Sequence, residues 1–400
     1  MLLTSAAPTY RSVDCLRCNP LLEKPSSRLP KILDSCPIGN MKKFPSLPIW
    51  TVVAPIAAWM LIIGTRFDLG LVYTFLLVVG LLGGVLAAVY HAEVVAHRVG
   101  EPYGTLVLAL AVTLIEVALI VSLMLAGGEE TMGLARDTVF AAIMIILNGI
   151  VGICLLAGAS RHKEQTFGLL GVSASLATLA AIAVLTLVLP NYTSSAVGPF
   201  YSSSQLAFIA IISLVLYGTF VLVQTVRHRD YFLPDESTND EEVHAAPPSD
   251  KVAWISGGLL LVCLGAVVLL AKSLAPSLEL AVASVGAPKT LVGIIIAAVV
   301  LLPEGLAAVR AARANRLQTS LNLALGSALA SIGLTIPAVA IVSLTTGWSL
   351  SLGLDVKSTV LLLLSFIVAT LSLGTGRTTV MQGTIHLVIF AVYLFTTIVP

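Results

Sequence analysis

The sequence VVLLPEGLAAVRAARANR, residues 299–316, places the carboxylate of Glu304 between a proline and a glycine, at the end of a long apolar run. A second stretch, LALAVTLIEVALIVSLM at residues 108–124, contains a single acidic residue, Glu116, with uncharged residues on both sides. At about 1.5 Å of rise per helical residue, Glu116 lies near the middle of the bilayer if this segment spans it. Both stretches therefore predict membrane helices that carry an ionisable group.

The composition extends this prediction to the whole chain. Of its 400 residues, 57% are hydrophobic and 11% are charged, whereas ordinary soluble domains have roughly 25% charged residues. We therefore predict an all-α polytopic membrane protein whose main partner is the lipid bilayer. The net charge of +1 argues against a nucleic-acid partner, and the sequence leaves a monomer and a homodimer equally open.

Apolar runs bounded by charged or turn residues predict about eleven transmembrane helices. These expected spans are residues 49–64, 71–90, 104–126, 138–158, 167–189, 205–226, 252–271, 290–309, 321–344, 359–373 and 379–398. The first of them follows residues 1–48, which we expect to be a disordered extension. Met41, followed by two lysines and an apolar run, is an alternative start.

The distribution of lysine and arginine predicts the orientation. With the N-terminus in the cytoplasm, most of these residues fall at cytoplasmic ends of the spans, as the positive-inside rule requires. An odd number of spans then places Pro400 on the outer side. We expect a multi-pass membrane protein with a cytoplasmic N-terminus and an external C-terminus.

An acidic polar loop at residues 227–251, expected to be cytoplasmic, divides the remaining spans into two halves. Residues 71–226 and 252–398 contain five spans each, and 49–64 is one extra helix before them. Because five is odd, the halves have opposite orientations, as in transporters built from inverted repeats. Glu116 and Glu304 both fall in the second span of their half, so we expect a 5+5 inverted repeat with the two glutamates at matching positions.

The glutamate pair is the candidate binding site for a cation or for protons. Burying an ionised carboxylate costs several kcal/mol, so such residues are seldom carried in a span without a function; a protonated glutamate that joins helices by hydrogen bonds is the structural alternative. Pro303 has no N–H for the carbonyl of Val299, so we expect the helix to kink or break and to release that oxygen beside Glu304. Gly305 removes bulk on the other side.

Other oxygen atoms are expected to complete the site as supporting ligands. Thr113 lies one turn before Glu116, and Asn148 is the only amide in its apolar segment. Ser327, Ser331 and Thr335 recur every four residues and so form a polar stripe on one helix face. Packing of helices through small residues is the alternative explanation of this stripe.

Carboxylate, hydroxyl, amide and carbonyl oxygens together make a hard site with a charge of −2 when both glutamates are ionised. Ca²⁺, which takes about 6–8 oxygen ligands in flexible geometry, suits such a site better than Mg²⁺. Protons compete with the metal ion for the same carboxylates. Because a bare charge is costly to move through the membrane, the site crosses either protonated or loaded, and this predicts Ca²⁺/H⁺ exchange without a cofactor.

Two blocks, residues 92–124 and 286–337, resemble the two α-repeats of the bacterial calcium/proton antiporters in the cation/calcium exchanger superfamily. The resemblance runs from about Leu71 to the C-terminus. It implies that Glu116 and Glu304 bind the cation and that the protein lies in the bacterial inner (plasma) membrane. Many members have a Gly-Asn pair shortly before each glutamate, whereas this chain has Val112-Thr113 and Val300-Leu301 at the matching positions. Na⁺/H⁺ or K⁺/H⁺ exchange is therefore the alternative.

Two other classes of protein fit the sequence less well. The segment HAEVVAH sets His91 and His97 six residues apart, which is not the HExxH spacing of a zinc protease, so no enzyme is predicted. Glu93, between these histidines, is a candidate cytoplasmic relay. A cation channel is a distant alternative, because channels usually assemble their filter from several subunits or a re-entrant loop.

The predicted topology can be tested by thiol labelling. In a variant without the five native cysteines, a cysteine replacing Ser237 should react with a membrane-impermeant maleimide in everted vesicles but not in right-side-out vesicles. A cysteine replacing Ser194, between the fifth and sixth expected spans, should show the opposite pattern. Labelling of both positions from the same side would contradict the predicted orientation of the halves.

Overall fold

The structure of the protein, a computed structural model, describes residues 47–65, 70–100, 103–127, 131–233, 248–284, 286, 288 and 290–399. The predicted N-terminal extension, except for residues 47 and 48, lies outside this range. So does most of the predicted acidic loop, residues 234–247. By their mutual contacts, the residues of the range Pro45–Pro400 form one compact unit.

The first six expected spans are all helical. The first three are α1 (Ile49–Gly64), α2 (Gly70–Val99) and α3 (Tyr103–Gly127). The fourth span consists of α4 (Leu134–Met144), the π-helix η2 (Ile145–Ile150) and α5 (Val151–His162), and the fifth of α6 (Leu169–Ala183), the π-helix η3 (Val184–Val188) and the 3₁₀ turn η4 (Leu189–Tyr192). The sixth is α7 (Ser203–Leu222), which ends in the π-helix η5 (Val223–Arg227). A short 3₁₀ turn, η6 Arg229–Tyr231, follows. Within the described residues, every π-helical segment lies in this first half of the chain.

The remaining five expected spans are also confirmed. They are α8 Asp250–Ser284, α9 Thr290–Arg313, α10 Leu317–Thr346, α11 Val356–Leu373 and α12 Val380–Ile398. Ten helices of the described chain are long and apolar enough to cross a membrane, and α1, with 16 residues, is shorter. In place of π-helical segments, this half has single prolines inside three helices: Pro276 in α8, Pro303 in α9 and Pro337 in α10.

One element was not predicted from the sequence. A two-residue strand, β1 (Gln165–Thr166), pairs antiparallel with β2 (Arg377–Thr378), so that Gln165 lies opposite Thr378. β1 follows α5 in the first half of the chain and β2 lies between α11 and α12 in the second half, so this short pairing connects the two halves. Strands of this length have too few alternating residues to be recognised in a sequence.

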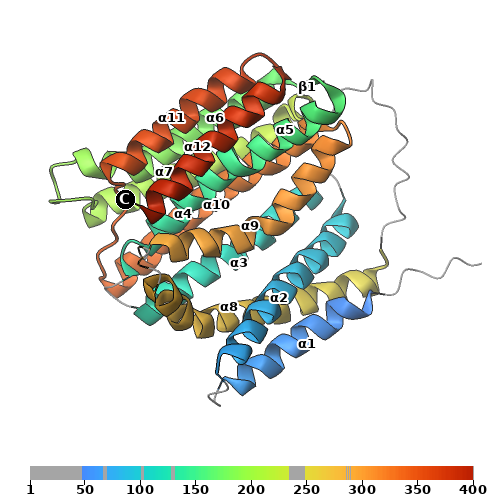
Figure 1. Ribbon diagram of the computed structural model, residues 1–400, viewed down its shortest axis with the longest axis vertical. Helices are drawn as coiled ribbons and strands as arrows, with labels where there is room; N and C mark the ends of the chain where they lie inside the picture. Colours follow the sequence, from blue (N-terminus) through green and yellow to red (C-terminus); the bar gives the residue numbers. More distant parts are fainter. Residues whose placement is uncertain are drawn as a thin grey trace, which may run out of the picture. The chain divides into compact units, whose positions relative to one another are not determined.

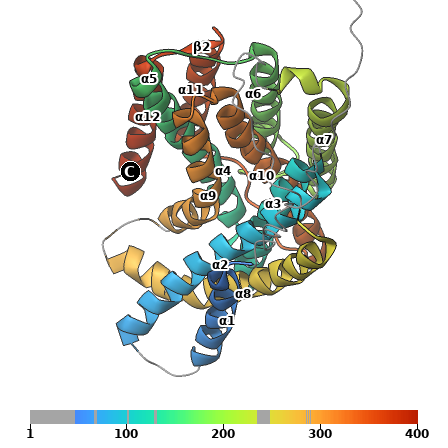
Figure 2. The same ribbon diagram turned by 90° about the vertical axis from the view of Figure 1, so that its right-hand side faces the viewer.

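The helices fall into two neighbouring groups in space (Figures 1 and 2). In both views α1, α2 and α8 lie side by side, and α2 and α8 pack along each other. On the other side, α10 packs against α4, α5, α6, α7 and α9, and it also contacts α3. Helix α10 is therefore the centre of the larger group, while α3 connects it to α2 and α8.

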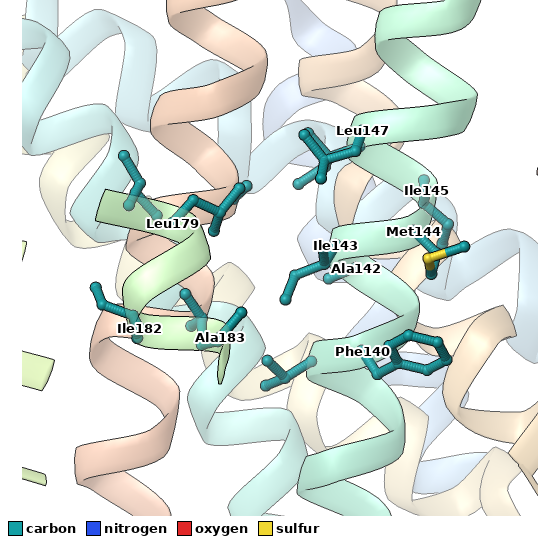
Figure 3. Packing of buried hydrophobic residues seen from close by; sticks show 14 of the residues in the cluster. Phe140, Ala142, Ile143, Met144, Ile145, Leu147, Leu179, Ile182 and Ala183 are labelled. Carbon is teal, nitrogen blue, oxygen red and sulfur yellow. The ribbon is translucent and has the colours of Figure 1, made fainter. Parts of the chain in front are cut away.

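The main hydrophobic core fills the space around α10. Figure 3 shows part of it, with Leu179, Ile182 and Ala183 of α6 on one side and the side chains of α4 and η2 on the other. Most of these residues are fully buried, as Ile146 and Leu147 illustrate. Side chains in this core are therefore held by packing between several helices, which gives nearby polar groups fixed positions.

The ends of the central loop differ from the prediction, because helix extends into it from both sides. The helix that begins as α7 ends at Arg227, and α8 already begins at Asp250. Asp250 forms an ion pair with Arg98, close to the end of α2 (Nη2–Oδ1, 2.5 Å). Since α2 ends where α8 begins, the two helices run antiparallel, as the opposite orientation of the two halves requires.

Helix α12 packs so tightly on α5 that a glycine is needed at position 383. A Cβ atom added to Gly383 would lie 2.6 Å from the backbone nitrogen of Leu156 and 2.9 Å from the carbonyl oxygen of Gly152. Gly383→Ala should therefore force the two helices apart and cost roughly 1–3 kcal/mol of stability. The measurement is the apparent melting temperature of the purified protein in detergent.

Gly218 of α7 provides the matched control, because nothing lies within 4 Å of a Cβ atom added there. Gly218→Ala should leave stability unchanged or raise it by roughly 0.5–1 kcal/mol, since alanine loses less backbone entropy on folding than glycine does. Equal melting temperatures of the two variants would show that the contact between α5 and α12 is not as close as described.

Candidate functional site: a pair of buried carboxylates

Glu116 lies in the middle of α3, where its side chain is only 3% exposed. Its Oε1 accepts a hydrogen bond of 2.6 Å from the Oγ of Ser331 on α10. Ser331 is itself 2% exposed. A carboxyl group of the first half of the chain is therefore held by a hydroxyl group of the second half.

Glu304 of α9 is held in the same way. Its Oε2 accepts a short hydrogen bond from the Oγ of Ser327, one turn before Ser331 on α10. Glu304 is more exposed than Glu116 and belongs to the half-buried residues. The two carboxyl groups thus differ in access, although each of them is bonded to a serine of the same helix.

The two serines bring the glutamates together. Residues four positions apart on an α-helix lie on one face, about 6 Å apart along its axis, so Ser327 and Ser331 direct both carboxyl groups to one stretch of α10. The carboxyl groups of Glu116 and Glu304 also interact electrostatically. In each of them one oxygen accepts the serine hydrogen bond, and this leaves the other oxygen free for a proton or a cation.

Of the two expectations for Pro303, a kink or a break, the structure shows no break. Helix α9 continues through Pro303 as one α-helix, although its ribbon changes direction along its length (Figure 1). The missing N–H of Pro303 still leaves the carbonyl of Val299 without its usual partner. A bend of the helix releases one backbone oxygen, whereas a break would release several.

Gly305 has a packing role that the sequence did not indicate. A Cβ atom added at this position would approach the side chain of Ile150 in η2 to 3.2 Å. The absence of a side chain therefore lets α9 lie close to the π-helical segment of the first half. This contact fixes the part of α9 that carries Glu304.

Two threonines supply further hydroxyl groups near the pair. Thr113 is buried on α3, and its Oγ1 donates to the carbonyl of Ala109 at 2.9 Å, which leaves the lone pairs of the oxygen free. Thr335 lies one turn beyond Ser331 on α10 and is fully buried. Among the described residues its hydroxyl group has no hydrogen-bond partner, so the stripe of α10 continues beyond the serines as a polar surface.

Asn148 is bonded away from the pair, contrary to the expectation that it is a supporting ligand. Its Nδ2 donates to the Oγ of Ser365 on α11 at 2.8 Å, and its Oδ1 lies 3.3 Å from the Nδ1 of His386 on α12. The Nε2 of His386 lies 2.8 Å from the Oγ of Ser372. These residues form a second buried polar cluster. A histidine in the apolar segment 379–398 was the sequence signal that could have revealed it.

Glu93, the candidate relay, lies near the end of α2 on an exposed part of the helix. It interacts electrostatically with His97 of its own helix and with Arg310 of α9. Its described interactions therefore run between α2 and α9 at one end of the bundle, and none of them reaches Glu116 or Glu304. A relay role for Glu93 stays a prediction.

A pocket of about 280 Å³ lies elsewhere in the molecule and is lined by charged residues that include Asp137, Asp355 and Lys357. Neither Glu116 nor Glu304 lines it. In the part of the chain that the structure describes, no three acidic, histidine or cysteine side chains cluster as metal ligands. A cation at the glutamate pair would thus be held by two carboxylates together with hydroxyl and carbonyl oxygens.

A bundle of membrane helices that holds two interacting carboxyl groups beside hydroxyl oxygens is typical of membrane transporters of cations. The comparison with known proteins identifies the family within this class. The chain belongs to the sodium/calcium exchanger protein family, whose model matches residues 69–226 and 255–399. The two matched ranges are the two five-helix halves, while α1 lies outside both.

Similar proteins are found in several bacteria. The protein y4hA of Sinorhizobium fredii, whose name describes an ionic transporter, is 48% identical over 358 residues, which cover 88% of this chain and 97% of that protein. The sodium-potassium/proton antiporter ChaA of Escherichia coli is 38% identical over 324 residues, with coverages of 80% and 87%. A Ca²⁺/H⁺ antiporter of Aphanothece halophytica is 26% identical over 280 residues, with coverages of 66% and 75%.

Solved structures confirm the fold. The native structure of YfkE has a TM-score of 0.67 and 17% sequence identity, and the match covers 88% of this chain and all of that chain. The crystal structure of the H⁺/Ca²⁺ exchanger CAX has a TM-score of 0.64 and 16% identity, with coverages of 86% and 88%. At 17% and 16% sequence identity, this similarity shows a shared arrangement of helices.

The hydrogen bond between Ser331 and Glu116 provides a test of the site. Ser331→Ala leaves the buried carboxyl group without this donor, which costs roughly 1–3 kcal/mol. We expect the half-saturating concentration of the transported cation to rise roughly tenfold. Ser331→Thr retains the hydroxyl group and should restore most of the affinity. The measurement is the initial transport rate as a function of cation concentration.

Ser213→Ala is the matched control, since Ser213 is as deeply buried on α7 but donates only to the carbonyl of Ile209 on its own helix, at 2.9 Å. This variant should transport with unchanged affinity. An equal loss of affinity in both variants, or none in Ser331→Ala, would mean that the bond to Glu116 has no special part in binding.

Proposed function

We propose that the protein exchanges a cation for protons across the membrane and that Glu116 and Glu304 bind both in turn. The observation that carries this proposal is the pair of hydrogen bonds by which Ser327 and Ser331, on one face of α10, hold two interacting carboxyl groups. Relatives named as cation/proton antiporters support the same reaction. Because the pair lies within apolar helices, the uncharged and the loaded forms of the site cost least to bury.

The exchange follows from competition at the free carboxyl oxygens. With protons bound, the pair is neutral and each serine hydroxyl can remain bonded to its glutamate. A cation that enters must displace these protons, since it needs the ionised carboxylates as ligands. The oxygens of Thr113 and of the Val299 carbonyl are the further ligands that we propose. Because the same residues bind either protons or the cation, but not both at once, the flux of the cation is coupled to the flux of protons.

Ca²⁺ is the first candidate for the transported cation. Two carboxylates supply a charge of −2, and the neighbouring donors are all oxygen atoms, which is the donor set that Ca²⁺ prefers. Relatives named as Ca²⁺/H⁺ antiporters share 26% and 24% identity with this chain. This proposal keeps the cation that the chemistry of the two glutamates suggested.

Na⁺ or K⁺ is the second candidate, and a specific observation favours it. The relative named as a sodium-potassium/proton antiporter is 38% identical and matches more of the chain than the relatives named for Ca²⁺. The residues before the two glutamates also differ from the Gly-Asn pairs of many calcium exchangers. A site with fewer amide ligands suits a cation that needs fewer oxygens.

For the setting of the exchanger, we propose the inner membrane of a bacterium, with the N-terminus and the central loop in the cytoplasm and the C-terminus outside. The antiparallel run of α2 and α8 and the two separate matches of the family model support an inverted repeat of residues 71–226 and 252–398. α1 (Ile49–Gly64) is the extra helix in front of this repeat.

The reaction can be measured in everted vesicles energised by respiration. Addition of a transported cation should release protons from the vesicles and restore the fluorescence of a pH-sensitive dye, so Ca²⁺, Na⁺, K⁺ and Mg²⁺ are added in turn. A response to Ca²⁺ at the lowest concentration supports the first candidate, and a response to Na⁺ or K⁺ supports the second. Cation flux that follows the membrane potential alone would indicate a channel.

Replacement of either glutamate should abolish exchange. Glu116→Gln and Glu304→Gln keep the volume and the hydrogen-bonding groups, but they remove the charge that binds protons and cations, so insertion should persist while exchange is lost. Asp at either position shortens the side chain by one methylene and should weaken affinity more than insertion. Protein level in the membrane and dye response are measured on the same vesicles.

Glu279→Gln, on an exposed part of α8, is the control with the same chemical change. This variant should exchange cations at the wild-type rate. Wild-type exchange in both Glu116→Gln and Glu304→Gln would instead show that the buried pair only joins α3, α9 and α10.

A further inference from the structure

A histidine with one unused nitrogen lies buried among α1, α2 and α8. His91 of α2 is fully buried, and its Nε2 lies 3.1 Å from the carbonyl oxygen of Thr51 on α1. Because a carbonyl oxygen can only accept, Nε2 must carry the proton. The Nδ1 of the neutral ring is therefore an acceptor, and it has no hydrogen-bond partner among the described residues.

A serine with the same deficit lies on the facing helix. Ser256 of α8 is fully buried, and its Oγ likewise has no hydrogen-bond partner in the described part of the chain. In a helix a serine usually donates to the carbonyl four residues earlier, but this hydroxyl does not. Two buried polar atoms without partners are unusual in a folded protein, and each of them needs an explanation.

The ion pair between Arg98 and Asp250 shows that His91 and Ser256 lie at the same level. Counted from this ion pair into the antiparallel helices, His91 is seven residues along α2 and Ser256 is six residues along α8. At about 1.5 Å per residue both lie roughly 10 Å inside the ion pair. Figure 2 shows that α2 and α8 lie against each other.

Both residues also lie on the faces that the two helices turn to each other. Ala88, one turn from His91, and Cys263, two turns from Ser256, belong to one buried hydrophobic cluster between α2 and α8. Residues three, four and seven positions apart share a helix face. The free Nδ1 and the free Oγ therefore belong to the same seam, which we call the α2–α8 seam.

We propose that His91 and Ser256 form a second proton-binding site in the α2–α8 seam, separate from the glutamate pair. A proton taken from cytoplasmic water adds to the lone pair of Nδ1 and gives an imidazolium ion, and no other covalent bond changes. The new Nδ1–H can donate to the Oγ of Ser256, while Nε2–H keeps its bond to Thr51. This inference rests on the proposed exchange function.

The surroundings leave the proton on His91 without an acidic partner. The ionisable groups on the helices packed against it and on α2 itself are Tyr73, Tyr90, Glu93, His97, Arg98, Tyr103, Glu116, Asp250, Lys251, Cys263, Lys272, Glu279, Glu304, Arg310 and Arg313. Asp250 is paired with Arg98, and Glu93 interacts with His97 and Arg310. The described residues of α1 carry no charge. Ser256 is therefore the partner that the charged ring would use.

The seam adjoins the two helices that carry the glutamates. The hydrophobic cluster that contains Ala88 and Cys263 also contains Ile115, next to Glu116, and Val299 packs against it. A proton on His91 adds a hydrogen bond between α2 and α8 and fixes the surface on which Ile115 and Val299 rest. Exchange should therefore slow as the cytoplasmic pH falls, because the protonated seam resists the rearrangement that carries the site across the membrane.

The test uses everted vesicles, in which the cytoplasmic face is outside, and measures the initial exchange rate against external pH at saturating cation. In His91→Gln the acidic limb of the profile should move to lower pH by roughly half a unit or more, since glutamine does not titrate. Ser256→Ala should move it in the same direction, because the imidazolium ion loses its acceptor. His97→Gln, at an exposed histidine on the same helix, and Ser273→Ala, at a half-buried serine on α8 that donates to the carbonyl of Leu269 on its own helix, should leave the profile unchanged.

A second measurement uses the wild-type protein and therefore does not depend on how well a variant inserts. Hydrogen–deuterium exchange at the imidazole C2 position, followed by mass spectrometry of the wild-type protein, reports the titration of each histidine. His91 should titrate over the pH range of the acidic limb. A ring that does not titrate between roughly pH 5 and 8.5, or unshifted profiles in both variants, would overturn the inference. Absence of exchange in the wild type for every cation would instead reject the proposed function.

Discussion

Two carboxyl groups buried in apolar helices are the constraint on which the arrangement depends. Glu116 and Glu304 lie on different helices, and each needs a donor that a lipid-facing helix cannot supply. Ser331 and Ser327 of α10 provide these donors one turn apart. For this, α10 must lie between α3 and α9, and the structure places it at the centre of the larger helix group. The cost of burying charge is thus offset by the position of one helix.

The helices of the two halves depart from regular α-helical geometry in different ways. The first half contains the π-helical segments, and one of them, η2, lies against Gly305 of α9. The second half has interior prolines, of which Pro303 removes a hydrogen bond just before Glu304. Both departures change the direction of side chains or release backbone groups without opening the helix to lipid. A duplicated topology therefore does not give two equivalent halves of a site.

The polar side chains inside this bundle differ in how many of their hydrogen-bonding groups have partners. In the cluster of Asn148, Ser365 and His386, the hydrogen bonds join η2, α11 and α12, which suits a rigid part of the protein. The glutamates have one bonded oxygen each, and the α2–α8 seam contains unused acceptors and donors. At the glutamate pair and in the seam, this unused capacity is what the proposed binding of protons and cations would use.

The sequence by itself determined the eleven spans, their division into two halves and the two glutamates at matching positions, because apolar length and isolated charges are properties of local sequence. Tertiary structure alone decided which oxygens serve which carboxyl group. Asn148 and Ser331 both looked like ligands, yet Asn148 faces α11 and α12 while Ser331 reaches Glu116. Likewise His91 and Ser256, 165 positions apart in the printed sequence, share a level only because α2 and α8 pack antiparallel. The rotation and pairing of helices depend on packing over the whole bundle, and no single segment encodes them.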